Sequence, residues 1–260
     1  MFSVVVPMYN SELTIEKCIC SICNQTRVDL IKEILVINDG STDESVEKVK
    51  KLQSVFSNIK IINKPNGGVS TARNVGMRLA KEDWVAFIDS DDEWMINKIE
   101  LQSEILKNYS EILFLGANRN DEFIKIGEEV YEGVYKINFT QLLFKTWPHT
   151  STVVISKEVI DRVGYFDENR SHCEDSQYWY KVAKFTDIYY LYESLELAGG
   201  GKLSFGTSGL SSNLRKMHQG NISNYKELYL EGTINWIRFI LVYIYEKIKY
   251  LRRIIITKKR

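Results

Sequence analysis

Short apolar runs alternate with segments of helical periodicity over the first part of the chain. An apolar run bounded by polar turn residues is typical of a strand buried on both faces of a sheet. Between these runs apolar residues recur at helical spacing, as in Ala72, Val75, Gly76 and Leu79. The pattern predicts strands at 2–7, 33–38, 58–63 and 84–88, separated by helices at 12–25, 44–54 and 70–80. Because such alternation is typical of a mostly parallel sheet flanked by helices, we expect an α/β fold with a single Rossmann-like sheet.

The second part of the chain is less regular. We expect one helix and three strands there, at 174–185, 112–115, 152–155 and 188–191. Residues 198–209 are rich in glycine and are predicted to form a mobile loop. A boundary near residue 110 would divide the domain into halves at 1–110 and 111–223. Residues 224–260 are expected to form a C-terminal helical appendage.

The charge distribution argues against a nucleic-acid-binding protein. The chain has 260 residues, of which 44% are hydrophobic, enough for a large core. Its 34 basic and 34 acidic residues balance, but residues 238–260 hold eight basic residues and one acidic residue. The rest of the chain therefore has a surplus of seven acidic residues, so no nucleic-acid partner is expected.

The termini and cysteines indicate a cytoplasmic protein. No basic segment precedes a long apolar one at the N-terminus, so no secretion signal is expected. No uncharged apolar window reaches about 18 residues, so no membrane-spanning helix is predicted. Four cysteines favour a reducing compartment. The pair Cys20 and Cys23 lies in a predicted helix and is interpreted as packing.

The C-terminal segment 234–260 mixes aromatic and aliphatic residues with Lys and Arg. Its longest uncharged run, 239–245, has seven residues, too few to cross a membrane. Such a helix can lie on an anionic membrane surface, where each basic residue adds about 1 kcal/mol. The alternative is packing on the domain itself or on a second subunit in a homodimer.

An acidic cluster follows the fourth predicted strand, at Asp89, Ser90, Asp91 and Asp92. Three adjacent carboxylates repel one another unless a cation lies between them. Mg²⁺ and Mn²⁺ commonly use one or two carboxylates together with substrate phosphates. The cluster therefore predicts a divalent metal site. The alternative is acidic capping of a helix that would begin at 93–94.

Polar residues also follow the other three strands, at 7–12, 39–43 and 64–68. The carboxyl ends of parallel strands meet at one edge of a sheet, where ligands bind. Asp39 is a candidate acceptor for a base N–H group, and Asp43 is a candidate at the same edge, with a helix cap as the alternative. The glycine turn at 66–68 runs into a helix and suits an anion, but it matches neither a dinucleotide nor a P-loop motif.

Two later motifs carry candidate chemistry. Asp175 follows Glu174 at the start of a predicted helix, so it is a candidate general base, with helix capping as the alternative. Arg215 and Lys216, expected on a mobile loop, are candidates for closing over a diphosphate. His218 follows them and is a candidate metal ligand.

In this order the motifs resemble those of family 2 glycosyltransferases with the GT-A fold, of the kind that builds bacterial surface polysaccharide such as O-antigen or capsule. The resemblance covers about residues 2–184 and rests on five motifs, VVVPMYN, VINDGSTD, NGGVSTARNVG, FIDSDD and VGYFDE…CEDSQYW. The resemblance implies inverting transfer from a nucleotide-diphosphate sugar, commonly a UDP-sugar. It would make residues 1–110 the nucleotide-sugar half and 111–223 the acceptor and catalytic half.

The resemblance also implies roles for individual residues. Uridine and phosphate would contact the strand-end residues Pro7, Tyr9, Asn10, Glu12, Asp39, Gly68, Arg73, Asp89 and Ser90. Asp91 would ligate Mn²⁺ or Mg²⁺, with His218 as a loosely matched second ligand. Asp175 would be the catalytic base, with Glu174 beside it.

The resemblance and the residue chemistry together predict transfer of a hexose or N-acetylhexosamine to an oligosaccharide acceptor. A polyprenyl-diphosphate-linked acceptor and a peripheral position on the inner face of the cytoplasmic membrane fit the basic tail. Two alternatives stay open. A sugar-phosphate nucleotidyltransferase would need a glycine-rich loop after the first strand, where this chain has Pro7 to Asn10. A non-catalytic sugar-nucleotide-binding module would need no acid at Asp175.

Overall fold

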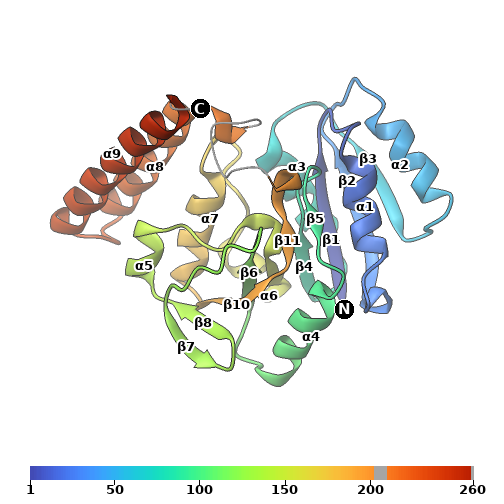
Figure 1. The fold of residues 1–260 in the computed structure, drawn as a ribbon, viewed down its shortest axis with the longest axis horizontal. Helices are drawn as coiled ribbons and strands as arrows, with labels where there is room; N and C mark the ends of the chain where they lie inside the picture. Colours follow the sequence, from blue (N-terminus) through green and yellow to red (C-terminus); the bar gives the residue numbers. More distant parts are fainter. Residues whose placement is uncertain (202–209, 259–260) are drawn as a thin grey trace.

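The computed structural model describes residues 1–201 and 210–258. Most of the glycine-rich segment that was expected to be a mobile loop, residues 202–209, therefore lies outside the described residues. The described chain forms a nine-stranded sheet with helices on both faces (Figure 1). The predicted α/β fold is confirmed.

The order of the strands across the sheet is β3-β2-β1-β4-β9-β6-β10-β8-β7. The first four neighbours pair in parallel, and of the nine strands only β9 and β8 run against the others. The strands are β1 Phe2–Met8, β2 Ile31–Asn38, β3 Ile59–Asn63, β4 Trp84–Phe87, β6 Phe114–Asn118, β7 Glu128–Tyr131, β8 Val134–Ile137, β9 Val154–Ser156 and β10 Ile188–Ser194. The sheet is continuous across the expected boundary near residue 110.

Helices cover the sheet in two layers because successive residues of a strand point to opposite faces. In β1, Val4 and Val6 pack on one face and Val5 on the other, and all three are fully buried. On the face of Val4 lie α1 Ile15–Cys23, α2 Ser45–Gln53 and α4 Lys98–Asn108. On the face of Val5 lie α3 Val69–Leu79, α5 Phe139–Phe144, α6 Lys157–Val163, α7 Glu174–Ala183 and α8 Leu214–Leu230, with α9 Trp236–Lys258 packed against α8.

Helix α3 lies unusually close to β1. A Cβ atom added to Gly76 would lie 2.3 Å from a methyl group of Val5, so only glycine allows this approach. The close packing fixes the start of α3 beside the end of β1. Arg73, one turn before Gly76, is thereby held at the carboxyl edge of the sheet.

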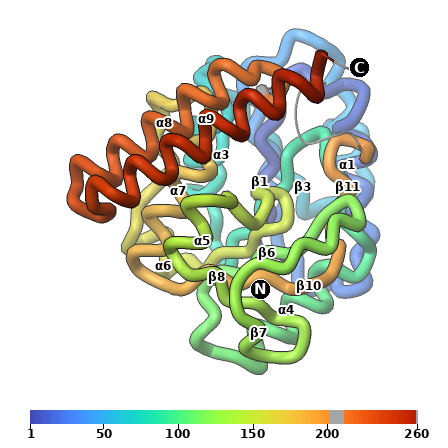
Figure 2. Tube along the Cα trace, turned by 60° about the vertical axis from the view of Figure 1, so that its left-hand side comes forward, coloured from blue at the N-terminus to red at the C-terminus, as the bar shows by residue number. Residues whose placement is uncertain are grey.

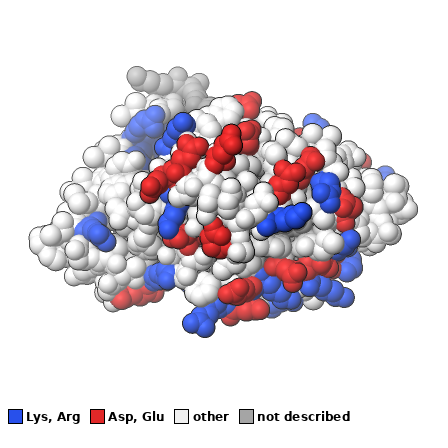
Figure 3. Space-filling model, turned by 90° about the horizontal axis from the view of Figure 1, so that it is seen from below, with Lys and Arg blue, Asp and Glu red and all other residues white. Residues whose placement is uncertain are grey.

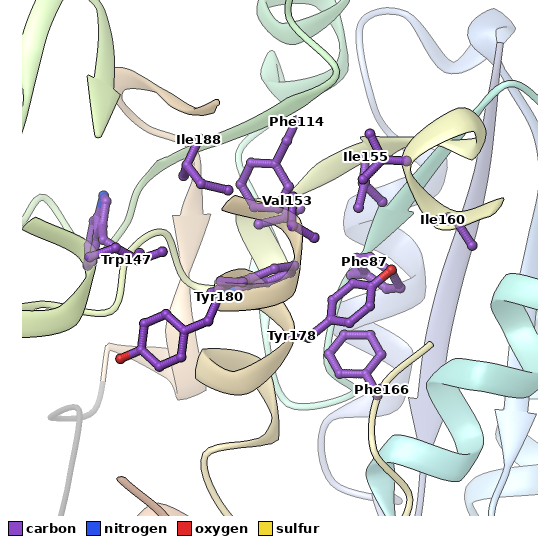
Figure 4. Close-up of a cluster of buried hydrophobic side chains, with 14 of the residues drawn as sticks. Phe87, Phe114, Trp147, Val153, Ile155, Ile160, Phe166, Tyr178, Tyr180 and Ile188 are labelled. Carbon is purple, nitrogen blue, oxygen red and sulfur yellow. The ribbon is translucent and has the colours of Figure 1, made fainter. Parts of the chain in front are cut away.

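An aromatic cluster fixes helix α7 on the same face (Figure 4). Trp179 meets Phe114 edge to face at 4.8 Å, and Tyr178 stacks on Phe166 at 4.3 Å between ring centroids. Aromatic pairs of this kind contribute about 0.5–1.5 kcal/mol beyond the area that they bury. The cluster therefore positions the first turn of α7, which carries Glu174 and Asp175.

The expected helix start at Glu93–Trp94 is wrong. These two residues form the short strand β5, which pairs with β11 Glu196–Leu197 in a second, two-stranded sheet. Helix α4 begins only at Lys98. The acidic cluster therefore does not cap a helix, because a tertiary strand pairing takes the place of the expected helix.

The C-terminal helical appendage is confirmed and consists of α8 and α9, which lie side by side (Figure 2). Helix α8 crosses the expected boundary between residues 223 and 224. In the described ranges, no helix is both long and apolar enough to cross a membrane.

Candidate functional site

The acidic loop after β4 places its three carboxylates in different environments. The Asp89 side chain is partly exposed, Asp91 is exposed and Asp92 is buried. The loop turns through a hydrogen bond from the Asp92 N–H to the Asp89 carbonyl at 3.0 Å. It is held to the rest of the domain by the Asp89 N–H, which donates to Ser151 Oγ at 2.9 Å. The three acids of this loop thus differ in their exposure to solvent.

Arg73 joins the acidic loop to the start of α7. Its guanidinium donates to both carboxylate oxygens of Asp89, at 2.7 and 2.9 Å, and to Glu174 Oε1 at 2.9 Å. Burial would lower the pKa of Arg73, but the Asp89 and Glu174 carboxylates raise it above its ordinary value. Arg73 therefore stays charged and bridges the two halves of the site.

Helix α7 begins with the two candidate catalytic acids. Glu174 is buried, and burial followed by the charge of Asp175 raises its pKa, against the effect of Arg73. Asp175 is partly exposed, and its Oδ1 accepts the Ser176 N–H at 2.7 Å. The helix N-terminus favours both negative charges. Glu174 thus faces Arg73, whereas Asp175 remains accessible from solvent.

Asp39 is already bound to the glycine turn. Its two carboxylate oxygens accept the N–H groups of Gly67 and Gly68 at 2.9 and 2.8 Å, and it forms an ion pair with Lys64. Gly68 has φ 89°, which a residue with a side chain rarely adopts. A base N–H would therefore have to share Asp39 with this turn, and the base contact of Asp39 stays a prediction.

The loop after β1 holds the neighbouring strand ends in place. Pro7 is buried within β1, while Tyr9 is exposed at the rim. Asn10 has φ 46°, and its Oδ1 accepts the Thr42 N–H at 2.9 Å. Ser90 lies 2.7 Å from the hydroxyl of Ser11, which ties this loop to the acidic one. The Tyr9 side chain is therefore exposed and accessible to a ligand at this loop.

Glu12 and Asp43 each accept a hydrogen bond from the loop that carries the other residue. Glu12 Oε2 accepts the N–H of Glu44 at 3.0 Å, just before α2. Asp43 accepts the N–H of Glu12 and that of Ser45, each at 3.0 Å. The N-cap residue of α2 is Glu44, which makes no side-chain cap hydrogen bond, so the interpretation of Asp43 as a helix cap stays a prediction. The nucleotide contact of Glu12 stays a prediction, since its carboxylate has this structural partner.

Sequence reasoning missed a second cluster beside the acidic loop. Candidate ligand atoms of Asp92, His149 and Glu196 all lie within 4.8 Å of one another, and in the described part of the chain neither Asp91 nor His218 belongs to this group. Burial raises the pKa of Glu196 to about 7 and lowers that of His149. Two carboxylates and an imidazole are ligands that Mn²⁺ accepts.

The same residues of this cluster also have protein partners. Asp92 accepts hydrogen bonds from Ser151 Oγ at 2.5 Å and the Gly199 N–H at 2.7 Å, and His149 Nδ1 lies 2.7 Å from Glu196 Oε1. The cluster could therefore hold a metal or only fasten residue 199 to the acidic loop. The sequence signal that could have pointed to this cluster was Asp92, the third acid of the acidic loop. Glu196 gave no such signal, because it reaches the site only through the β5–β11 pairing.

His218 lies between α8 and α9. Its ring stacks on Tyr250 with centroids 4.5 Å apart, and Nδ1 is 3.6 Å from Glu246 Oε1. The ligand role of His218 stays a prediction that requires the ring to leave this position. Arg215 and Lys216 are exposed in the first turn of α8, so their expected position on a mobile loop is wrong.

A family model described as glycosyl transferase family 2 matches residues 3–170, so the chain belongs to glycosyl transferase family 2. A chondroitin synthase of Pasteurella multocida (strain Pm70) is 37% identical over 121 residues, which cover 46% of this chain and 12% of that protein. The chain spans about a quarter or less of the length of the first curated relatives that it matches.

Two solved structures have the same fold. One is S. aureus TarS 1-349 in complex with UDP-GlcNAc, with a TM-score of 0.68 and 22% identity, covering 93% of this chain and 70% of that one. The other is the mannosyltransferase PcManGT from Pyrobaculum calidifontis in complex with GDP-Man and Mn²⁺, with a TM-score of 0.67 and 17% identity, covering 94% and 68%. The predicted GT-A fold is confirmed by this likeness.

Proposed function

We propose that the chain is an inverting, metal-dependent glycosyltransferase that moves a hexose or N-acetylhexosamine from a UDP-sugar to a saccharide acceptor. The observation that carries the proposal is the Arg73 bridge, which bonds Asp89 at 2.7 Å and Glu174 at 2.9 Å. The bridge joins the loop proposed to bind the diphosphate to the helix that carries the proposed base. Family membership and the UDP-GlcNAc complex of TarS support the donor class.

Asp175 is the proposed general base. It is partly exposed at the N-terminus of α7, next to Glu174, whose charge faces Arg73. Asp175 would take the proton of an acceptor hydroxyl as that oxygen attacks the anomeric carbon opposite the diphosphate. An α-linked donor would then give a β-glycoside. Glu174 would help to position Asp175 through its bond to Arg73.

The acidic loop fits a divalent cation. Asp91 offers an exposed carboxylate two residues after Asp89, and Mg²⁺ or Mn²⁺ commonly binds one or two carboxylates plus substrate phosphates. When bound there, the cation would neutralise the charge of the diphosphate leaving group. We prefer Asp91 to Asp92 as the ligand because the Asp91 side chain is exposed, whereas Asp92 is buried. The Mn²⁺ complex of PcManGT supports the choice of metal.

We place the reaction on the inner face of the cytoplasmic membrane, with a polyprenyl-diphosphate-linked oligosaccharide as acceptor in surface polysaccharide synthesis. The support is the exposed apolar and basic surface of α9. The similarity to a chondroitin synthase agrees with a polysaccharide product.

The proposal is tested by screening UDP- and GDP-sugars for thermal stabilisation with Mn²⁺ and with EDTA. We expect one UDP-sugar to raise the melting temperature only with metal, since a ligand that binds the folded state stabilises it. That donor is then incubated with the enzyme, and release of UDP is measured. Stabilisation without any turnover, with or without acceptors, would indicate a binding module instead of an enzyme.

A further inference from the structure

Helix α9 presents an apolar stripe to solvent. Six of its aliphatic side chains are each 50–59% exposed and recur at alternating spacings of four and three residues, namely Ile237, Leu241, Ile244, Ile248, Leu251 and Ile255. Residues at these spacings share one face of a helix. Exposed apolar patches of more than a few hundred Å² mark interaction sites.

The opposite face of α9 is fixed against α8, so the stripe cannot turn inward. Phe239 stacks on Tyr229 with centroids 5.2 Å apart, and Tyr250 stacks on His218 at 4.5 Å. Glu246 is fully buried between the two helices, where it lies 2.9 Å from Lys249 Nζ. The apolar stripe is therefore a stable outer surface of the folded protein.

Basic residues flank the stripe on both sides. With 3.6 residues per turn, exposed Arg238 and Arg252 fall along one side and exposed Lys247 and Lys258 along the other. Glu246 is the only acid in α9, and its burial leaves the exposed surface of the helix without an acid. An apolar face with basic flanks is typical of a helix that lies on an anionic lipid surface.

The same charges disfavour a symmetric dimer through this stripe. In a two-fold interface the same patch meets itself, so basic flanks would face basic flanks. Their like charges would repel without an acid of α9 between them. A lipid surface of negative charge attracts both flanks at once.

The turn between α8 and α9 extends the apolar surface. Leu230 and Trp236 there are 72% and 61% exposed. Seen from below, the left-hand end of the molecule, where α8 meets α9, carries few charges (Figure 3). Tryptophan is enriched at membrane interfaces because its ring is apolar and its N–H is polar.

We propose that the outward face of α9, together with the α8–α9 turn, docks on an anionic lipid membrane. The C-terminal end of α9 lies at the top of Figure 1, toward which β1 also runs, so this end of the docking helix and the carboxyl end of β1 lie on the same side of the molecule. This inference deepens the proposed function, because it would hold the protein at the membrane in which a lipid-linked acceptor lies.

The test is co-sedimentation of the full chain with vesicles of phosphatidylcholine alone or with about a third phosphatidylglycerol. We expect binding to the mixed vesicles that weakens in high salt. Lys247→Glu with Arg252→Glu should lower that binding at least about 25-fold, since each lost basic charge is worth about fivefold. Ile244→Ser with Ile248→Ser should also release the protein.

Matched control variants carry the same kinds of substitution outside α9. Lys51→Glu with Lys107→Glu alters the net charge equally on α2 and α4, and Val55→Ser with Leu79→Ser removes exposed apolar groups away from α9. Equal loss in controls and α9 variants would overturn the docking proposal. The proposal would also be overturned if light scattering without vesicles showed a dimer that the double change Ile244→Ser with Ile248→Ser dissociates.

Transfer to a soluble saccharide separates this inference from the proposed function. We expect the α9 variants to keep that activity in detergent while they lose vesicle binding. If vesicle binding depends on α9 but the protein transfers no sugar, the docking proposal stands and the proposed glycosyltransferase activity is contradicted. If the protein transfers sugar and the α9 variants bind vesicles as well as wild type does, only the docking proposal is contradicted.

Discussion

Two ionic clusters meet at the acidic loop, and they differ in how their charges are balanced. On one side, the guanidinium of Arg73 lies between Asp89 and Glu174 and pairs with both. On the other, Asp92 and Glu196 share a buried space with the imidazole of His149, and burial raises the pKa of both carboxyls. In the first cluster a cation pairs directly with both acids, whereas in the second burial outweighs the nearby Arg119 and Lys98 charges and favours a protonated Glu196. The contrast teaches that neighbouring acids of one motif can serve separate tasks.

The largest effect is expected from Asp175→Asn. This change keeps the shape of the side chain beside the Arg73 cluster but removes the proposed base. General-base catalysis commonly contributes 10²–10⁴-fold, so transfer should fall by about that factor. Donor affinity should stay within about twofold, as measured by calorimetry with Mn²⁺. Near-normal transfer would remove Asp175 from the role of base.

Arg73→Met tests the cation-held cluster. Removing one partner of a buried ion pair leaves uncompensated charge and should lower the free energy of unfolding by about 3–5 kcal/mol. The matched control is Arg78→Met in the same helix, because Arg78 pairs with Glu168 at the surface at 3.4 Å. An exposed pair of this kind contributes about 1 kcal/mol or less. Equal losses in urea unfolding would show that the Arg73 bridge is no stronger than a surface pair.

Glu196→Gln tests the proton-dependent cluster. The folded pKa of Glu196 is about 7, above its ordinary value of 4.5. An acid with a raised folded pKa stabilises the fold fully below the unfolded pKa, and that contribution is lost as pH rises through the folded pKa. As pH rises from 4.5 to 7 in metal-free buffer, the free energy of unfolding of wild type should fall by up to about 3 kcal/mol more than that of Glu196→Gln. Parallel unfolding curves for the two proteins across this pH range would contradict the raised pKa.

Asp43→Ala should have the smallest effect. It removes the carboxylate that accepts the N–H groups of Glu12 and Ser45, and a hydrogen bond of this kind contributes about 1 kcal/mol. Donor affinity should change less than threefold, in contrast to changes in the acidic loop. A tenfold loss of affinity without loss of stability would instead place Asp43 in the donor site.

The parallel half of the fold and the acidic loop could be predicted from sequence because both depend on local pattern. The continuous apolar run of β1 predicts burial on both faces, and Asp89 to Asp92 follow β4 directly. The positions of Glu196 and His218 could not be predicted, since they depend on tertiary pairing. Glu196 is placed by β5 and β11, two-residue strands without periodicity, and His218 by its stack on Tyr250.

The hydrogen-bond partners of the predicted site residues could not be predicted from the sequence either. Asp39 and Glu12 lie where the motifs place them, but their carboxylates bond to backbone N–H groups of the glycine turn and of Glu44. Arg73 reaches Glu174, a residue 101 positions away, only because α3 and α7 lie on the same face of the sheet. The motifs therefore predict candidate site residues but not the contacts among them.

The most direct test of the central claim is calorimetric binding of the UDP-sugar to wild type and to Asp91→Ala, each with Mn²⁺ and with EDTA. If the acidic loop holds the metal against the diphosphate, Mn²⁺ should strengthen binding to wild type at least tenfold and have little effect on Asp91→Ala. In EDTA the two proteins should bind alike. Equal metal dependence in both proteins would contradict the claim that Asp91 holds the cation.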